Sequence, residues 1–249
     1  PIPGLDKVPY MTSTEALRQT RLPKSMIIIG GGYIGAEMGH FYAALGCKVT
    51  VIQRGPLLLS REDKDISELF TKIWKEKYGV VCNCEVMEVE KKGKNIIVHT
   101  KHNGKEKIFV AEKLLIATGV RPNSDTLDVA KTGVKTNEKG FIAVNKFMET
   151  FAKNIWALGD IAGIYLFKHS ANLEAEYVLN NLFEEKKAVD YYPMPHAIFS
   201  NPQIAGVGMT EQEAREKGKE YVLGKYEYKN TGMGAAMEEK DGFVKFIVD

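Results

Sequence analysis

Residues 26–37 read MIIIGGGYIGAE, and this stretch decides the fold. Its apolar start predicts a buried strand, and its end opens a helix that we expect to run from about Tyr33 to Leu45. Between the two stand three glycines in G-x-G-x-x-G spacing, namely Gly30, Gly32 and Gly35. A glycine turn that follows a strand and opens a helix is typical of a dinucleotide-binding site.

Each glycine of this turn has an expected role. Gly30 permits the tight turn, Gly32 lets the backbone approach a pyrophosphate, and Gly35 lets helix and strand pack closely. The helix N-terminus adds N–H groups and a partial positive charge where phosphates would bind. A second expected strand, residues 48–52, completes the β-α-β unit that the fingerprint requires. The alternative, a glycine turn with a purely structural purpose, is disfavoured by this context.

Composition narrows the class of protein. The chain has 249 residues, 44% of them hydrophobic and 27% charged, with a formal net charge of +2. Such a balance gives no basic field for nucleic acid or an anionic membrane. No apolar stretch approaches the ~20 residues of a membrane span, and no signal peptide is visible. Three cysteines, Cys47, Cys82 and Cys84, lack C-x-x-C or metal-ligand spacing. We therefore expect a cytoplasmic enzyme without a metal site.

The remaining pattern is that of an α/β protein. A second helix should end near Tyr78, and short strands are expected from Val80 to Ile116. Asn103-Gly104 is a strong hairpin signal between two of these strands, so a β-meander is inserted before a buried strand at 114–119. Further along we expect strands near 141–144 and at 154–160, a helix at about 168–185, and alternating strands from Val222 onward.

Five motifs along the chain resemble, in order, those of the flavoprotein pyridine nucleotide-disulfide oxidoreductases. They are PIPG (1–4), GGGYIGAE (30–37), ATGVRPN (117–123), ALGD (157–160) and PHAIFSNPQIAGVGMTE (195–211). The resemblance implies a Rossmann-like NAD(P)-binding domain with the inserted meander, part of an FAD-binding domain, and the start of an α+β dimerisation domain. The implied boundaries are a connection from the FAD domain at 1–21, the NAD(P) domain at 22–118, the FAD part at 119–190 and the dimerisation part at 191–249.

The resemblance also implies that segments of the family pattern are missing. The family's first FAD half, with its redox cysteine pair, and its C-terminal His-Glu pair have no counterpart in this sequence. We therefore expect a central fragment of a longer enzyme, inactive alone and homodimeric at full length. Its parent would move a hydride between NAD(P)H and FAD and exchange electrons with a disulfide and a thiol substrate. LFKHSANLEAEYV (166–178) looks closest to the dihydrolipoamide dehydrogenase and mycothione reductase branches, and the expected function is dihydrolipoamide dehydrogenase-like. A non-catalytic NADP-binding module or fragment is the alternative.

Two residues of the glycine turn and its helix are candidate catalytic groups by this resemblance. Tyr33 matches a tyrosine that lies over the flavin and swings aside for nicotinamide, whereas the alternative is a packed aromatic at a helix start. Glu37 matches an acid that pairs with a lysine of the FAD half, and its alternative is a solvated helix glutamate. Ile34 belongs to the same nucleotide fingerprint.

The expected FAD contacts lie further along the chain. Asp160 follows Gly159 in the second FAD motif, where the family's aspartate holds a ribityl hydroxyl; a helix N-cap or turn aspartate is the alternative. Gly119 belongs to the motif that returns the chain to the FAD domain. Leu166, Phe167 and Lys168 match a segment whose backbone meets the flavin ring edge.

The choice between NADP and NAD depends on the end of the second strand. NAD enzymes usually place an acid there, but this chain has Gln53 and then Arg54. An arginine can bind a 2′-phosphate bidentately, and Arg54 matches an arginine of NADPH-using reductases. NADP is therefore favoured, while the alternatives are that Gln53 bonds a ribose hydroxyl and that Arg54 faces solvent.

Overall fold

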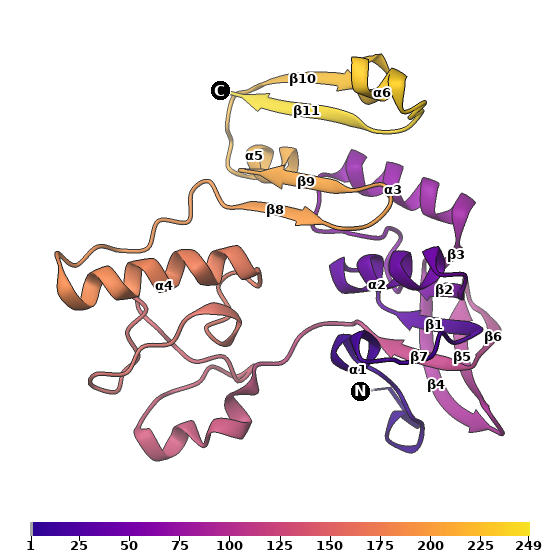
Figure 1. The fold of residues 1–249 in the computed structure, drawn as a ribbon, viewed down its shortest axis with the longest axis horizontal. Coiled ribbons are helices and arrows are strands. Elements are labelled where there is room, and N and C mark those ends of the chain that lie inside the picture. Colours follow the sequence, from indigo (N-terminus) through magenta and orange to yellow (C-terminus); the bar gives the residue numbers. More distant parts are fainter. Residues whose placement is uncertain (1) are drawn as a thin grey trace. The chain divides into compact units, whose positions relative to one another are not determined.

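The computed structural model describes residues 2–249, which form two compact units (Figure 1). The first unit comprises the chain up to Gly119 together with 197–205 and 209–249. The second comprises 120–196 and 206–208. Across residues 2–249, none of the helices combines the length and apolar character needed to cross a bilayer.

A four-stranded parallel sheet is the centre of the first unit. Its strand order is β3-β2-β1-β7, with β1 in the middle. The strands are β1 (Ser25–Ile29), β2 (Lys48–Ile52), β3 (Gly79–Val81) and β7 (Lys113–Ile116). Helix α2 (Tyr33–Ala44) connects β1 to β2, and α3 (Lys64–Lys77) connects β2 to β3. The predicted β-α-β unit is therefore confirmed, and β7 ends three residues before the expected Gly119.

Strand β1 is apolar throughout because both of its faces are covered. Met26 and Ile28 point into a core shared with the helices, whereas Ile27 and Ile29 point into a second core on the opposite face. All four side chains are buried. This alternation follows from the two-residue period of a strand, and a sheet buried on both sides accounts for the continuous apolar run.

The predicted β-meander covers one face of the sheet. Antiparallel strands β4 (Cys84–Lys92), β5 (Asn95–His102) and β6 (Lys105–Ala111) form it in that order. Val89 and Val98 contribute to the core shared with β1. Asn103 and Gly104 both have positive φ between β5 and β6, as the hairpin signal requires.

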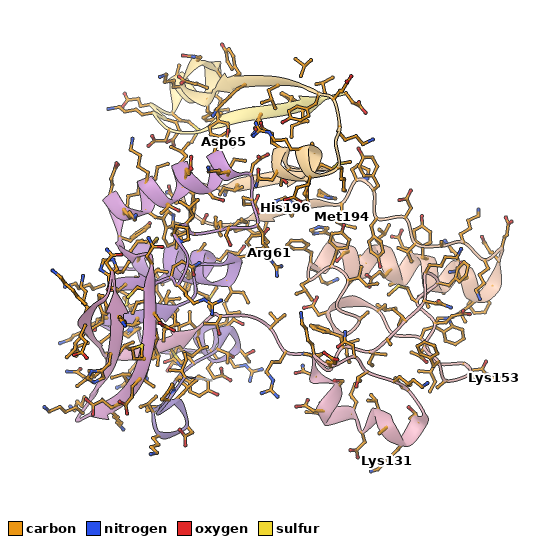
Figure 2. The ribbon with its side chains drawn as sticks, turned by 180° about the vertical axis from the view of Figure 1, so that it is seen from behind. Arg61, Asp65, Lys131, Lys153, Met194 and His196 are labelled. Atoms are coloured by element: carbon orange, nitrogen blue, oxygen red, sulfur yellow. The ribbon has the colours of Figure 1, made fainter. Side chains whose placement is uncertain are left out.

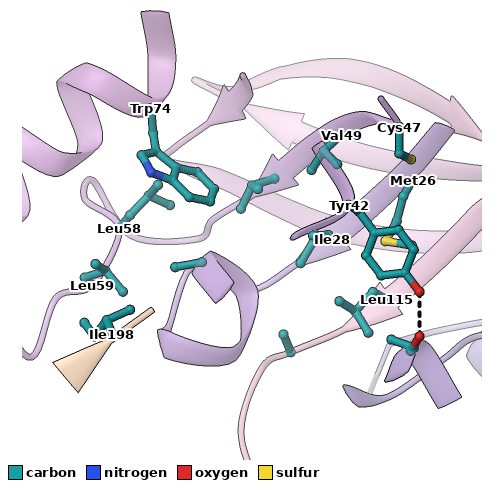
Figure 3. Close-up of a cluster of buried hydrophobic side chains, with 14 of the residues drawn as sticks. Met26, Ile28, Tyr42, Cys47, Val49, Leu58, Leu59, Trp74, Leu115 and Ile198 are labelled. Carbon is teal, nitrogen blue, oxygen red and sulfur yellow. Dashed lines mark hydrogen bonds between the residues drawn. The ribbon is translucent and has the colours of Figure 1, made fainter. Parts of the chain in front are cut away.

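The helices cover the opposite face, around Trp74 of α3 (Figure 3). In the close-up, Leu58 and Leu59 lie near Trp74, together with Ile198 from a distant part of the chain. At the other end of the cluster, the Tyr42 hydroxyl donates a 2.6 Å hydrogen bond to the carbonyl oxygen of Ala16. Ala16 belongs to the short helix α1 (Ser13–Leu17), which follows η1 (Leu5–Lys7). The core thereby joins the first residues of the chain to the sheet.

The C-terminal part of the first unit is a hairpin with short helices. Strands β10 (Val222–Glu227) and β11 (Phe243–Val248) pair antiparallel, with Lys225 opposite Lys245. Helix α5 (Glu211–Glu216) precedes this hairpin in the sequence, and η5 (Tyr228–Asn230) and α6 (Gly232–Ala236) lie between its two strands. A separate two-stranded sheet is formed by β8 (Pro195–Ile198) and β9 (Ile204–Val207).

The second unit is mostly irregular around one long helix. It contains η2 (Asn123–Leu127), η3 (Val129–Thr132), η4 (Gly159–Ile161) and α4 (Lys168–Phe183), the last of which confirms the helix expected there. The strands expected near 141–144 and at 154–160 were wrong, because the structure has only isolated bridges at Ile142 and Trp156. Met148 and Asn154 have positive φ, and such residues interrupt the extended backbone that a strand requires.

Candidate functional site

The glycine turn between β1 and α2 is packed tightly at two of its three fingerprint glycines. Gly30 has φ +112°, and a Cβ there would overlap the carbonyl oxygen of Ala117 on the neighbouring strand. A Cβ on Gly35 would overlap the carbonyl oxygen of Gly30. Backbone atoms cannot yield as a flexible side chain does, so both positions require glycine for steric reasons.

Gly32 is different, because open space surrounds it. A Cβ at this position would have no heavy atom within 4 Å, and the residue is exposed. Gly32 is also the N-cap of α2, and no side chain of the described residues caps this helix end by a hydrogen bond. The first turn of a helix presents N–H groups and partial positive charge, so the turn offers an open anion-binding position at one point.

Gln53 at the end of β2 is bonded to this turn. Its Oε1 accepts a 3.0 Å hydrogen bond from the Gly31 N–H, and its Nε2 donates to the Leu57 carbonyl oxygen at 3.3 Å. The Leu59 N–H in turn donates to the Gly31 carbonyl oxygen at 2.8 Å. Arg54 is exposed and forms no ion pair with any of residues 2–249. The side chain of Gln53 therefore links loop to loop, and Arg54 is available at the surface.

Tyr33 is half-buried at the start of α2, and its hydroxyl donates a 2.5 Å hydrogen bond to Glu62 Oε1. Burial raises the pKa of Tyr33 well above its usual range, and the bond to Glu62 raises it further. Glu62 is only 3% exposed. Tyr33 and Ile34 both pack against the core on the helical face of the sheet.

Glu37 lies one turn further along α2. Its Oε1 accepts a 2.9 Å hydrogen bond from the backbone N–H of Phe199, which follows β8. The side chain is half-buried rather than solvated. The solvated-helix alternative for Glu37 therefore does not describe this carboxylate.

In the second unit, Gly159 and Asp160 form the start of η4. Gly159 has φ +73°, in the left-handed region that favours glycine. Asp160 is exposed, and its carboxylate accepts no hydrogen bond from any of the described residues. The N-cap of η4 is Leu158, so Asp160 does not cap this turn.

Glu174 of α4 fixes the Gly159 turn by a hydrogen bond. This carboxylate is 0% exposed and accepts hydrogen bonds from the Gly159 N–H and, at 2.7 Å, from the Tyr191 hydroxyl. Burial, followed by the bond to Glu174, raises the pKa of Tyr191. The arrangement holds the backbone beside Asp160 while leaving the Asp160 carboxylate exposed.

Leu166, Phe167 and Lys168 lead into α4. Phe167 is the N-cap position, and its ring stacks on His169 with centroids 5.3 Å apart. Lys168 begins the helix, and its Nζ contacts Asn172 Oδ1. Leu166 is half-buried. Because η4 is bonded to α4 through Glu174, these residues and Asp160 belong to one local structure.

The structure thus places the predicted site residues in two groups. The first unit holds Gly30, Gly32, Tyr33, Ile34, Gly35, Glu37, Gln53, Arg54 and Gly119. The second holds Gly159, Asp160, Leu166, Phe167 and Lys168. Gly119 is exposed with φ +155°, at the end of the first unit.

Two acids that hold members of these groups in place, Glu62 and Glu174, were not predicted from the sequence. Both are acids whose partners lie far away in the sequence, at separations of 29 residues for Tyr33 and 15 for Gly159. Glu174 stands in the amphipathic pattern of a helix, and Glu62 stands in the polar run SREDKD (60–65). The sequence offers one signal, which is that a helix register turns Glu174 toward the same face as the apolar Val178.

Comparison of the sequence with known proteins identifies the family to which this chain belongs. The sequence model of the pyridine nucleotide-disulphide oxidoreductases matches residues 1–177, and the model of their dimerisation domain matches residues 194–249. The chain belongs to the pyridine nucleotide-disulphide oxidoreductase family. The expected fold class is thereby confirmed, and members of this family use FAD and NAD(P)H.

Relatives within the family carry several different names. The chain is 38% identical over 219 residues to mercuric reductase of Staphylococcus aureus, covering 87% of this chain and 40% of the relative. It is 36% identical to mycothione reductase of Mycobacterium tuberculosis, covering 97% of this chain and 53% of the relative. Dihydrolipoyl dehydrogenase of Geobacillus stearothermophilus is 34% identical, with 96% and 51% covered. The chain therefore spans about half the length of these oxidoreductases.

Solved structures of the family agree with this fold. The copper(II) complex of the HOCl-induced flavoprotein disulfide reductase RclA from Escherichia coli superimposes with a TM-score of 0.91 at 32% sequence identity. The match covers 100% of this chain and 58% of that structure. The structural similarity thus covers the residues of both units.

Proposed function

We propose that the chain is the NADP(H)-binding part and a portion of the FAD-binding part of a flavin-dependent disulfide oxidoreductase. The observation that carries this proposal is the contrast within the glycine turn. Gly30 and Gly35 are closed by backbone contacts, whereas Gly32 faces open space at an uncapped helix N-terminus. Such a turn has room for a pyrophosphate at the place where the fingerprint requires it.

The end of β2 supports NADP over NAD. No carboxylate stands there to bond a ribose hydroxyl, and the Oε1 of Gln53 accepts from Gly31 instead. Arg54 is exposed and can pair with a 2′-phosphate. We therefore infer that Gln53 shapes the turn and that Arg54 provides the preference for NADP.

A flavin site is supported by the second unit. The carboxylate of Asp160 is exposed and caps no helix, so it can accept hydrogen bonds from a ribityl hydroxyl. The N-terminus of α4, with Leu166, Phe167 and Lys168, and the Gly119 linker would complete the contacts from this chain. When bound, nicotinamide and flavin would supply the hydride chemistry, while Tyr33 would gate access and Glu37 would pair with a lysine of the FAD half.

We assign the segments as a connection at 1–21, the NAD(P) domain at 22–118, the FAD part at 119–190 and the dimerisation part at 191–249. The match of the dimerisation-domain model to residues 194–249 supports a homodimer for the full-length protein. A substrate of the lipoamide type is favoured, with the dithiol as electron donor or the disulfide as electron acceptor, since dihydrolipoyl dehydrogenases are among the relatives.

The test is a titration of the 249-residue chain with NADPH and NADH, followed by nucleotide fluorescence. The decisive variant is Gly32→Val, because the protein leaves room for the added side chain while the proposed pyrophosphate needs that room. NADPH binding should be lost although the thermal unfolding curve changes little. Gly232→Val is the matched control, since Gly232 also has open space and starts a helix elsewhere.

An unaltered chain that binds neither nucleotide would refute the proposal. Equal NADPH affinity in Gly32→Val and in the unaltered chain would do the same. A full-length parent that binds NADPH but shows no flavin absorbance would instead indicate the non-catalytic nucleotide-binding module.

A further inference from the structure

Glu62 is a buried carboxylate that the proposed nucleotide site does not itself require. It lies in the loop between β2 and α3 and is 3% exposed. A buried carboxylate is stable only with hydrogen-bond donors close to it. One donor here is the hydroxyl of Tyr33, at 2.5 Å.

The backbone around Glu62 is fixed to the glycine turn as well. The Glu62 N–H donates to the Leu59 carbonyl oxygen at 2.9 Å, and the Leu59 N–H donates to the Gly31 carbonyl oxygen at 2.8 Å. The 59–62 loop is therefore bonded to the glycine turn twice, by the Leu59 backbone to Gly31 and by the Glu62 side chain to Tyr33. Movement of the Tyr33 hydroxyl away from Glu62 would remove a donor from a carboxylate that water cannot easily reach.

Helix α5, which belongs to the segment matched by the dimerisation-domain model, holds this loop from the other side. Gln212 Nε2 donates to the Glu62 carbonyl oxygen at 3.1 Å. The Glu211 N–H donates to both carboxylate oxygens of Asp63, at 3.2 Å each. The residues next to and including Glu62 are thus bonded to the first turn of α5.

Lys245 of β11 completes the connection. Its ammonium lies 3.0 Å from Asp63, 2.6 Å from Glu211 and 3.3 Å from Asp65, and the side chain is 7% exposed. Figure 2 shows Asp65 at the start of α3, facing the β10–β11 hairpin. A cation buried among three carboxylates fixes the loop, α5 and β11 in one arrangement.

We propose that Glu62 is a positioning residue for Tyr33, and that the Lys245 cluster holds Glu62 in place, so that segment 209–249 sets the orientation of the Tyr33 gate. The gating consequence rests on the proposed nicotinamide site. The positioning itself rests only on contacts within the first unit. A change in the packing of α5 or β11 would accordingly reach the nucleotide site through the 59–63 loop.

The experiment is NMR of the 249-residue chain carrying tyrosine labelled with carbon-13 at Cζ, with the Tyr33 signal assigned by Tyr33→Phe. Four variants are compared: Glu62→Ala, Glu62→Gln, Lys245→Met and Lys225→Met. Lys225 is the matched control, because it pairs with Asp65 at 3.0 Å from a more exposed position but does not contact Asp63 or Glu211. NADPH affinity is measured on the same samples.

In the unaltered chain the Tyr33 signal should show no ionisation up to pH 11. In Glu62→Ala the pKa of Tyr33 should fall, because the hydrogen bond and the charge of Glu62 are removed, but burial should keep it above the ordinary tyrosine value of about 10. Glu62→Gln, which keeps an acceptor, should retain the Cζ shift at neutral pH. Lys245→Met should move the Tyr33 signal toward its position in Glu62→Ala, and Lys225→Met should leave it unchanged.

Identical Tyr33 signals in Glu62→Ala and the unaltered chain would overturn the positioning role. Equal effects of Lys245→Met and Lys225→Met would overturn the role of the cluster. If the unaltered chain binds no NADPH while Tyr33 responds as expected, the proposed nucleotide function fails and the positioning of Tyr33 by Glu62 stands.

Discussion

Removal of the Glu174 carboxylate should loosen the Gly159 turn by an amount that the structure allows us to estimate. Glu174→Ala leaves two donors without this acceptor, the Gly159 N–H and the Tyr191 hydroxyl. Each unsatisfied buried donor costs about 1–3 kcal/mol, and water entering the vacated space offsets part of this. We expect the free energy of local opening to fall by about 2–4 kcal/mol. Since 1.4 kcal/mol corresponds to a factor of ten, amide exchange should accelerate about 30- to 700-fold.

The assay is hydrogen–deuterium exchange measured by mass spectrometry on a peptide spanning 157–163. Glu176→Ala is the control, because Glu176 is exposed on the same helix. Glu174→Gln should lie between the two, since the amide oxygen still accepts from the Gly159 N–H. Exchange at the unaltered rate in Glu174→Ala would refute the reasoning that this carboxylate holds the turn.

Three further predictions concern the first unit. Gly35→Ala should destabilise it by about 1–3 kcal/mol in urea unfolding, because the added Cβ overlaps the Gly30 carbonyl; unchanged stability would contradict the assigned steric role. Arg54→Ala should lower the ratio of NADPH to NADH affinity by about tenfold or more, whereas Arg18→Ala, at the exposed residue that follows α1, should leave the ratio unchanged. The hydrogen bond from Lys245 lowers the pKa of Glu211 in the folded protein. The ionised Glu211 carboxylate therefore stabilises the fold above its unfolded pKa of about 4.3, and this stabilisation is lost as the pH falls through the lower pKa of the folded state. Acid unfolding of Lys245→Met should therefore lack this component, and an acid limb identical to that of the unaltered chain would count against it.

The β-α-β unit could be predicted from the sequence because local signals agree there. The apolar run from Met26 to Ile29, the glycine spacing and the helix that follows all indicate one structure, and the run is buried on both faces of the sheet. The second unit shows where this reasoning ends. Residues 154–160 are apolar enough for a strand, yet the left-handed conformation of Asn154 and the turn at Gly159 leave only an isolated bridge. These turn conformations outweigh the local strand propensity, and the sequence pattern does not predict them.

Contacts over long separations account for what the sequence could not show at the candidate site. The fingerprint glycines follow a spacing rule, so Gly32 could be singled out in advance, and Asp160 was singled out because ALGD (157–160) resembles a family motif. The residues that hold them in place follow none. Glu62 and Glu174 become visible only when folding brings an acid beside a hydroxyl or a backbone N–H from another element.

The two hydrogen bonds of the Gln53 amide restrict how this chain could change coenzyme. The amide oxygen of Gln53 accepts a hydrogen bond from the Gly31 N–H, and its Nε2 donates one to the Leu57 carbonyl oxygen. A glutamate at this position could do the first but not the second, and would set a carboxylate oxygen against the Leu57 carbonyl. The single exchange that would introduce an acid for a ribose hydroxyl therefore loosens the loop that follows β2. Under the proposed preference for NADP, a switch toward NAD would require accompanying changes in residues 54–59, so the preference would depend on the loop as a whole.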